Sequence, residues 1–190
     1  MAEKTDARIE KSRAALLSTG LTLLLEKPNA SFSEIADRAG VGRTTLYRQF
    51  KTREQLIQAI ARRCLEDVSR AATEKASRAK SYREAIELIL WSAMPLADRL
   101  RFLTLFWGIA VQDDGIVELN ARYKRETIEL IDAAKREGGI EPTLPSDWIA
   151  DLIDSLFQVA WKLIDVNGYS ERDAAEMVTK TLFDGISPRA

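Results

Sequence analysis

The side chains best suited to chemistry in this sequence lie between Arg43 and Arg53, and they are hydrogen-bond donors and cations. Arginine, lysine, threonine, tyrosine and glutamine fill this stretch, which contains no acidic residue. Such side chains bind phosphate oxygens and the edges of bases. We therefore predict a DNA-binding surface that consists of Ser33, Arg43, Thr44, Thr45, Tyr47, Arg48, Gln49, Lys51 and Arg53.

Two short predicted helices position these side chains. Ser31 and Glu34 have the spacing of a capping box at the start of the first helix, and Gly40 ends it. The second helix buries Leu46 and Phe50, four residues apart, and turns its basic and hydroxyl side chains outward. Two helices joined by a short glycine turn are typical of a helix-turn-helix, whose second helix enters the major groove.

The outward side chains divide by chemistry into two groups. We expect bases to be read by Arg43, Thr45 and Gln49, because arginine pairs with guanine and glutamine with adenine. We expect phosphates to be held by Thr44, Tyr47, Lys51 and Arg53. The competing interpretation is a helical hairpin with an ordinary solvated face, but such a face usually mixes charges of both signs.

These residues also carry a family resemblance. The run AGVGRTTLYRQFKTREQLIQAI resembles the signature of the TetR family of bacterial transcriptional regulators, with matches at Thr45, Leu46, Tyr47, Phe50, Arg53, Glu54 and Leu56. The resemblance covers roughly residues 8 to 60. It implies that the remaining two thirds form an all-helical domain for ligand binding and dimerisation.

Composition argues against several other classes of protein. The chain of 190 residues has no histidine and a single cysteine, Cys64, so histidine-based catalysis, most zinc sites and an internal disulfide are excluded. We expect no enzyme activity, cofactor or metal. No apolar run reaches the length of a membrane span, and the charged N-terminus lacks a signal core, which predicts a cytoplasmic protein.

Charge is unevenly distributed along the chain. The formal net charge is −1, but residues 1 to 53 hold 10 basic and 6 acidic residues, a balance of +4. Residues 54 to 190 hold the other 18 basic and 23 acidic residues, a balance of −5. Because salt screens charges beyond about 8 to 10 Å, the local positive field is the one that DNA meets.

Helical periodicity and helix-ending residues predict an all-α protein of about nine helices. The first domain, residues 1–53, is a three-helix DNA-binding domain that contains the helix-turn-helix. The second, residues 54–190, is a helical ligand-binding and dimerisation domain, in which Ser146 and Ser170 cap the last two helices. Helix 4 links the two domains.

Two surfaces are predicted in the second domain. The penultimate helix has a wider apolar arc than one core contact requires, so we expect a homodimer interface formed by Ile149, Leu152, Leu156, Ala175, Val178 and Leu182. The alternative is that this helix is simply central to the core. A pocket for an apolar or aromatic small molecule is expected from Trp91, Met94, Phe106, Trp107, Tyr123 and Phe157.

The sequence thus predicts a DNA-binding transcriptional regulator. We expect a repressor that binds a palindromic double-stranded operator as a homodimer and is released when a small-molecule effector binds. The alternative is an architectural or partner-controlled DNA-binding protein without a small ligand, which a fully packed second domain would favour.

Overall fold

All of the regular secondary structure in the part of the chain that the structure describes is helical. The computed structural model describes residues 2–185, and the side chains of residues 9–185. Its helices are α1 (Ala2–Glu26), α2 (Phe32–Arg38), α3 (Arg43–Gln49), α4 (Arg53–Ala76), α5 (Tyr82–Ala93), the short 3₁₀ helix η1 (Met94–Leu96), α6 (Ala97–Ala110), α7 (Asp114–Arg136), α8 (Ser146–Asp165) and α9 (Glu171–Asp184). The all-α prediction is confirmed.

The chain divides into two compact units. The first unit consists of Met1–Cys64 together with Phe102–Ile116, and the second consists of Leu65–Arg101 together with Val117–Ala190. The divisions fall inside α4, α6 and α7, so these three helices each belong partly to both units. The first unit therefore extends past residue 53, where α4 begins, and includes a segment from the middle of the chain.

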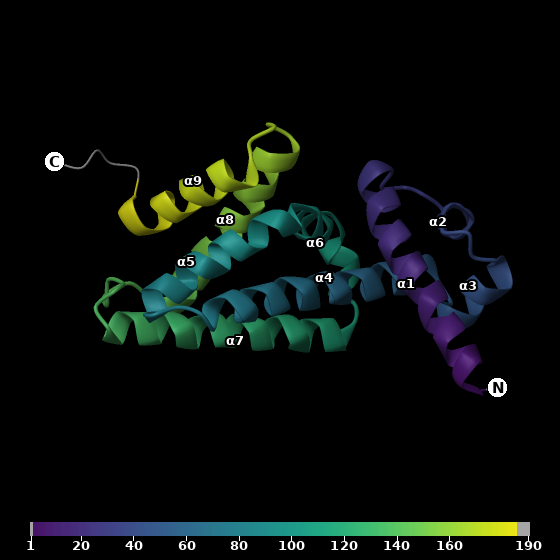
Figure 1. The fold of residues 1–190 in the computed structure, drawn as a ribbon, viewed down its shortest axis with the longest axis horizontal. Helices are drawn as coiled ribbons and strands as arrows, with labels where there is room; N and C mark the ends of the chain where they lie inside the picture. Colours follow the sequence, from purple (N-terminus) through teal and green to yellow (C-terminus); the bar gives the residue numbers. More distant parts are fainter. Residues whose placement is uncertain (1, 186–190) are drawn as a thin grey trace. The chain divides into compact units, whose positions relative to one another are not determined.

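Helices α1, α2 and α3 pack together in the first unit (Figure 1). Leu16, Ile35 and Leu46, one from each helix, are fully buried. Gly20 lets α1 approach its neighbours, since a Cβ atom there would lie 2.8 Å from Cδ1 of Ile60 and 3.5 Å from Cγ2 of Ile35. The three-helix arrangement thus depends on apolar burial around a close contact at Gly20.

The second unit has its own apolar core. Figure 1 shows α8 and α9 as a hairpin, and α9 also contacts α5 and η1. Their buried faces meet in a cluster that includes Leu90, Met94, Ile131, Ile153 and Val178. The cluster fixes which face of α8 and α9 points inward.

Helix ends mostly follow the sequence signals, with one difference. Ser170 caps α9 as predicted, by accepting from the Asp173 amide. Ser146 was expected to cap α8, but Pro145 occupies that position, and the Ser146 hydroxyl instead bonds Asp132 and accepts from Lys135 Nζ at 2.7 Å. Helix α7 begins at Asp114, soon after the end of α6 at Ala110.

Candidate nucleic-acid interface

The start of α2 is held by the predicted capping box. The Ser31 hydroxyl accepts from the Glu34 amide at 3.2 Å, and the Glu34 carboxylate accepts from the Ser31 amide at 2.7 Å. Lys27 Nζ donates to the same carboxylate at 2.6 Å. These hydrogen bonds lower the pKa of Glu34 to about 2, with Lys27 the largest cause, so the box is intact at neutral pH.

The turn between α2 and α3 has the geometry that its glycine predicts. Gly40 has a φ of 64°, a left-handed conformation that few other residues adopt. The Val41 amide then bonds the Ala36 carbonyl at 2.9 Å, and the Val41 side chain is buried. This turn sets the angle between α2 and α3.

Helix α3 buries its apolar side and exposes its basic side. Leu46 and Phe50 are 0% and 3% exposed. The Tyr47 ring, half exposed, packs edge-on against Phe32 of α2, with centroids 5.3 Å apart. The predicted contact residues that are well exposed are Arg43, Thr44, Tyr47, Arg48 and Lys51, whereas Ser33 and Thr45 are half-buried. The exposed set provides three cations and two hydroxyls on one short segment.

Gln49 does not have the exposed position expected of a base-reading residue. Its Nε2 donates to the Ile9 carbonyl of α1 at 3.3 Å, and its Oε1 is buried. The amide that would pair with adenine is therefore occupied, and Gln49 anchors α1 to α3. Sequence patterns could not reveal this contact, because a polar residue on α3 is compatible with either role.

Arg53, which we expected to contact a phosphate, makes two hydrogen bonds to the backbone. Its Nε donates to the Ala30 carbonyl at 2.9 Å and its Nη2 donates to the Pro28 carbonyl at 2.5 Å. These bonds join the start of α4 to the loop before α2. The Arg53 side chain thus holds the loop before α2 against the start of α4, and so supports the helix-turn-helix between them.

We expect Arg53→Ala to lower the free energy of unfolding by about 1.5 to 3 kcal/mol, because it leaves two carbonyls without a charged donor. Urea unfolding followed by circular dichroism measures the change. Arg48→Ala is the matched control, since Arg48 is exposed on α3. Equal small losses from the two variants would contradict the structural role of Arg53.

The predicted ligand-binding residues are divided between the units. Phe106 and Trp107 belong to the first unit, and the other four belong to the second. Phe106 packs against Phe102, with ring centroids 4.7 Å apart. Met94 and Phe106 are only 2% and 6% exposed, so they have little surface to offer a ligand in this conformation. The residues that keep accessible surface are Trp91, Trp107, Tyr123 and Phe157.

The predicted dimer residues mostly face the protomer's own core. Ile149, Leu156, Ala175 and Val178 are buried in the second unit's apolar cluster, and Leu152 and Leu182 are half-buried against it. The wide apolar arc of α8 therefore has two parts, one facing the core and one facing outward. The outward part includes Trp148, Val159 and Val166, at 52%, 51% and 68% exposure, which sequence reasoning had not separated from the core.

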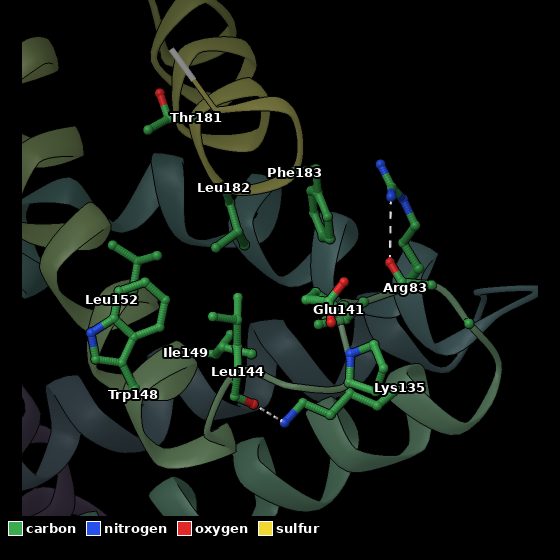
Figure 2. Close-up of a pocket in the computed structure, with 14 residues that line it drawn as sticks. Arg83, Lys135, Glu141, Leu144, Trp148, Ile149, Leu152, Thr181, Leu182 and Phe183 are labelled. Carbon is green, nitrogen blue, oxygen red and sulfur yellow. Dashed lines mark hydrogen bonds between the residues drawn. The ribbon is translucent and has the colours of Figure 1, made fainter. Parts of the chain in front are cut away.

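A pocket of about 590 Å³ opens in the second unit at the end where α7 leads into α8 (Figure 2). Apolar side chains, including Trp148, Leu152 and Leu182, lie on one side, and Arg83 and Lys135 lie on the other. The six predicted ligand residues do not line it. Among the residues that the structure describes, none of the helices is long and apolar enough to cross a membrane, and no cluster of three candidate metal ligands occurs.

Known proteins share both the first unit's motif and the fold. Residues 16–60 match the family model described as bacterial regulatory proteins, tetR family. The HTH-type transcriptional repressor LfrR of Mycolicibacterium smegmatis is 25% identical over 178 residues, covering 93% of this chain and 91% of LfrR.

Solved structures agree over nearly the whole chain. LfrR from Mycobacterium smegmatis in complex with proflavine has a TM-score of 0.78 at 22% identity, covering 96% of this chain and 99% of that one. FadR from Bacillus subtilis in complex with stearoyl-CoA has a TM-score of 0.74 at 16% identity, covering 92% and 99%. These structures support the fold, and the matched domain supplies the regulatory motif. Residues 16–60 of the chain thus form a DNA-binding domain of the tetR family of bacterial regulatory proteins.

Proposed function

We propose that this transcriptional regulator is a cytoplasmic repressor that binds a palindromic operator as a homodimer and is released by a small molecule. The observation that carries the proposal is the exposed basic face of α3, where Arg43 and Arg48 flank Tyr47 while Leu46 is fully buried. LfrR, which resembles the chain over nearly its full length, is named a repressor. The proposal involves no catalytic step and no cofactor.

DNA recognition is proposed to divide along α3. Arg43, exposed at the first position of the helix, would read a base, and the half-buried Thr45, two residues further along, would add a second contact. Thr44, Tyr47 and Lys51 would hold phosphates, with Arg48 adding charge. Gln49 and Arg53 would support this surface through their hydrogen bonds to backbone carbonyls of the same unit.

Arg43→Ala is expected to weaken binding to the selected operator by about 1 to 3 kcal/mol and to weaken binding to random DNA much less. The operator is obtained by selecting from random duplexes with the wild-type protein. Lys51→Ala is the control, because loss of a phosphate contact should affect all sequences alike and reduce the salt slope by about one. Equal losses for Arg43→Ala on both DNAs would show that Arg43 contacts a phosphate.

Dimerisation is proposed to use the outward face of α8. The residues Trp148, Leu152, Ser155, Val159, Lys162 and Val166 recur at spacings of 4, 3, 4, 3 and 4, and we call them the α8 stripe. They are exposed, except for the half-buried Leu152. On α9, Met177 is 42% exposed and lies one turn before Thr181, which lines the same pocket as Trp148. Four of the six residues of the α8 stripe are apolar, and exposed apolar surface favours association.

The effector is proposed to bind in the second unit near Asp154. This carboxyl group is exposed, yet the surrounding protein desolvates it and raises its pKa, with Lys124 opposing the shift. Lys124, on α7, is the cation that acts on this carboxyl group, so Asp154 lies on the side of α8 that faces α7. Phe157 lies three residues further along α8, and Tyr123 precedes Lys124 on α7. Aromatic side chains beside a carboxylate suit an aromatic cation.

Proflavine, which LfrR binds in a solved structure, is a suitable probe. We expect it to quench tryptophan fluorescence and to lower operator affinity by about 5- to 150-fold, the usual range of allosteric coupling. Asp154→Asn should weaken proflavine binding about tenfold or more, because a charged partner is lost. Since the pKa of Asp154 is raised, wild-type affinity for the dye should also fall as pH is lowered through that pKa.

Two controls separate the parts of this proposal. Proflavine can intercalate into DNA, but that effect is the same for wild type and Asp154→Asn. Quenching without any loss of operator affinity would retain the site and reject the switch. Absence of proflavine binding at any pH would reject an aromatic cation as the effector and would favour a DNA-binding protein without such a ligand.

A further inference from the structure

The pocket in the second unit is not used by the function proposed above. Its volume is about 590 Å³, which is within the usual size of a small-molecule site. The effector site proposed near Asp154 is a different place, because Asp154, Tyr123 and Phe157 do not line this pocket. The pocket is therefore a separate candidate ligand site.

The pocket has one apolar side and one cationic side (Figure 2). Trp148, Leu152 and Leu182 lie on the apolar side. Trp148 is 52% exposed, so this side offers a large apolar surface that the protomer itself leaves uncovered. Arg83 and Lys135 lie on the other side. Such a division suits a ligand with an apolar body and a negatively charged group.

Both cations have more hydrogen-bond donors than their contacts within the protein use. Lys135 Nζ donates to the Leu144 carbonyl and, at 2.7 Å, to the Ser146 hydroxyl, whereas an ammonium group has three donors. Arg83 Nη1 donates to the Gly139 carbonyl at 3.4 Å, whereas a guanidinium group has five donors. Each cation can therefore also donate to a ligand.

The acidic side chains around the pocket already accept hydrogen bonds. Glu141, the one acid among the lining residues, accepts from the Thr143 hydroxyl at 2.7 Å and from the Thr143 amide at 3.1 Å. Glu87 does not line the pocket, and it accepts from Arg83 Nε at 3.4 Å. With two cations and one acid, the lining side chains carry a net charge of +1. The pocket therefore favours an anion.

The walls of the pocket are held together across three helices. The Tyr82 amide donates to the Glu137 carboxylate at 2.8 Å, which joins the start of α5 to the end of α7. The Arg83 guanidinium lies over the Phe183 ring of α9, 4.4 Å from its centroid. The backbone at Gly139 approaches closely, since a Cβ atom there would lie 2.9 Å from Cβ of Arg83. A preformed pocket binds its ligand at a lower entropic cost.

We propose that this pocket binds a carboxylate that has an apolar body. The two carboxylate oxygens would accept from Arg83 and Lys135, in hydrogen bonds strengthened by charge. The apolar body would cover Trp148 and Leu152. The site is independent of the effector site near Asp154, for which an aromatic cation is proposed, so the second unit would bind two ligands of opposite charge.

Decanoate is the probe for this site, and decyltrimethylammonium, which has the same tail and the opposite charge, is its control. We expect decanoate to bind at least about tenfold more tightly, because only its head group can accept from the two cations. Isothermal titration calorimetry, at concentrations below micelle formation, measures both affinities. Equal affinities would overturn the proposal.

Charge-removing variants identify the residues that hold the carboxylate. Lys135→Gln should weaken decanoate binding about tenfold or more, whereas Lys135→Arg, which keeps the charge, should retain it. Arg83→Gln should cause a similar loss, and it is the second variant in case Lys135→Gln loosens the loop beside it. Arg136→Gln is the matched control, because Arg136 is exposed next to Lys135 and does not line the pocket. Unchanged affinity in both Lys135→Gln and Arg83→Gln would contradict the assignment.

Tryptophan fluorescence locates the bound decanoate. Trp148 lines the pocket, whereas the other three tryptophans do not. Decanoate should shift the emission of the wild-type protein to shorter wavelength, and Trp148→Phe should lose this shift while calorimetry still detects binding. A shift that persists in Trp148→Phe would place decanoate elsewhere and overturn the proposal. These measurements use neither proflavine nor operator DNA, so their failure would leave the proposed repressor function intact.

Discussion

Val159→Glu is expected to convert the protein into folded monomers and to lower operator affinity by at least about 100-fold. Val159 is 51% exposed at the middle of α8, so a charge there does not enter the protomer's core. In a two-fold pair, the two new carboxylates would lie close together in a dehydrated interface, where like charges repel strongly. A monomer binds one half-site only and loses the gain from simultaneous contacts, which is typically 10² to 10⁴.

Sedimentation velocity and fluorescence anisotropy with operator DNA measure the two effects of Val159→Glu. Gln158→Glu is the matched control, because Gln158 is exposed on the same turn of α8 but lies outside the α8 stripe. It adds the same charge and should leave both properties unchanged. A Val159→Glu protein that remains dimeric would show that α8 does not form the interface in this way.

Leu46→Ala is expected to lower the free energy of unfolding by about 2 to 5 kcal/mol, the usual cost of truncating a buried leucine. Leu46 is fully buried on the inner side of α3. Truncating it therefore leaves a cavity directly behind the exposed basic face of the helix. Small domains are stable by only about 5 to 15 kcal/mol in total. DNA affinity should therefore fall as well, even though Leu46 itself faces away from DNA.

Thermal unfolding and amide hydrogen exchange in α3 provide the measurements for Leu46→Ala. Thr44→Ala, at an exposed position of the same helix, should change stability by less than about 0.5 kcal/mol. Its effect should be confined to DNA binding. If the two variants had equal stability, the burial of α3 against its neighbours would be wrong.

Local sequence signals were sufficient for the helices of this protein because each signal acts within a few residues. Ser31 with Glu34 and the glycine at position 40 specify α2 and the turn, and the structure contains both. Ser146 shows the limit of this reasoning. Its position at the start of α8 suggested a cap, but a lysine and an aspartate on α7 compete for its hydroxyl.

Side-chain roles were harder to predict wherever they depend on a partner distant in sequence. Gln49 bonds a carbonyl 40 residues away, and Arg53 bonds carbonyls 23 and 25 residues away. Residue type and helical face cannot reveal such partners. The apolar arc of α8 poses the same problem. Periodicity places both Ile149 and Val159 on this arc, but it does not tell which of them faces the protomer's own core.

The composition of the first unit limits how a DNA-binding specificity could be transplanted between regulators. Residues 102–116 belong to this unit, and Phe102, Ala110 and Ile116 are fully buried. Gln58 Nε2 donates to the Ile109 carbonyl at 3.3 Å, and Arg62 pairs with Asp113 at 3.2 Å. A chimera joined after residue 64 would therefore combine α4 with a foreign α6–α7 corner. A functional exchange should instead carry two segments, 1–64 and 102–116, so that the modular unit is discontinuous in the gene.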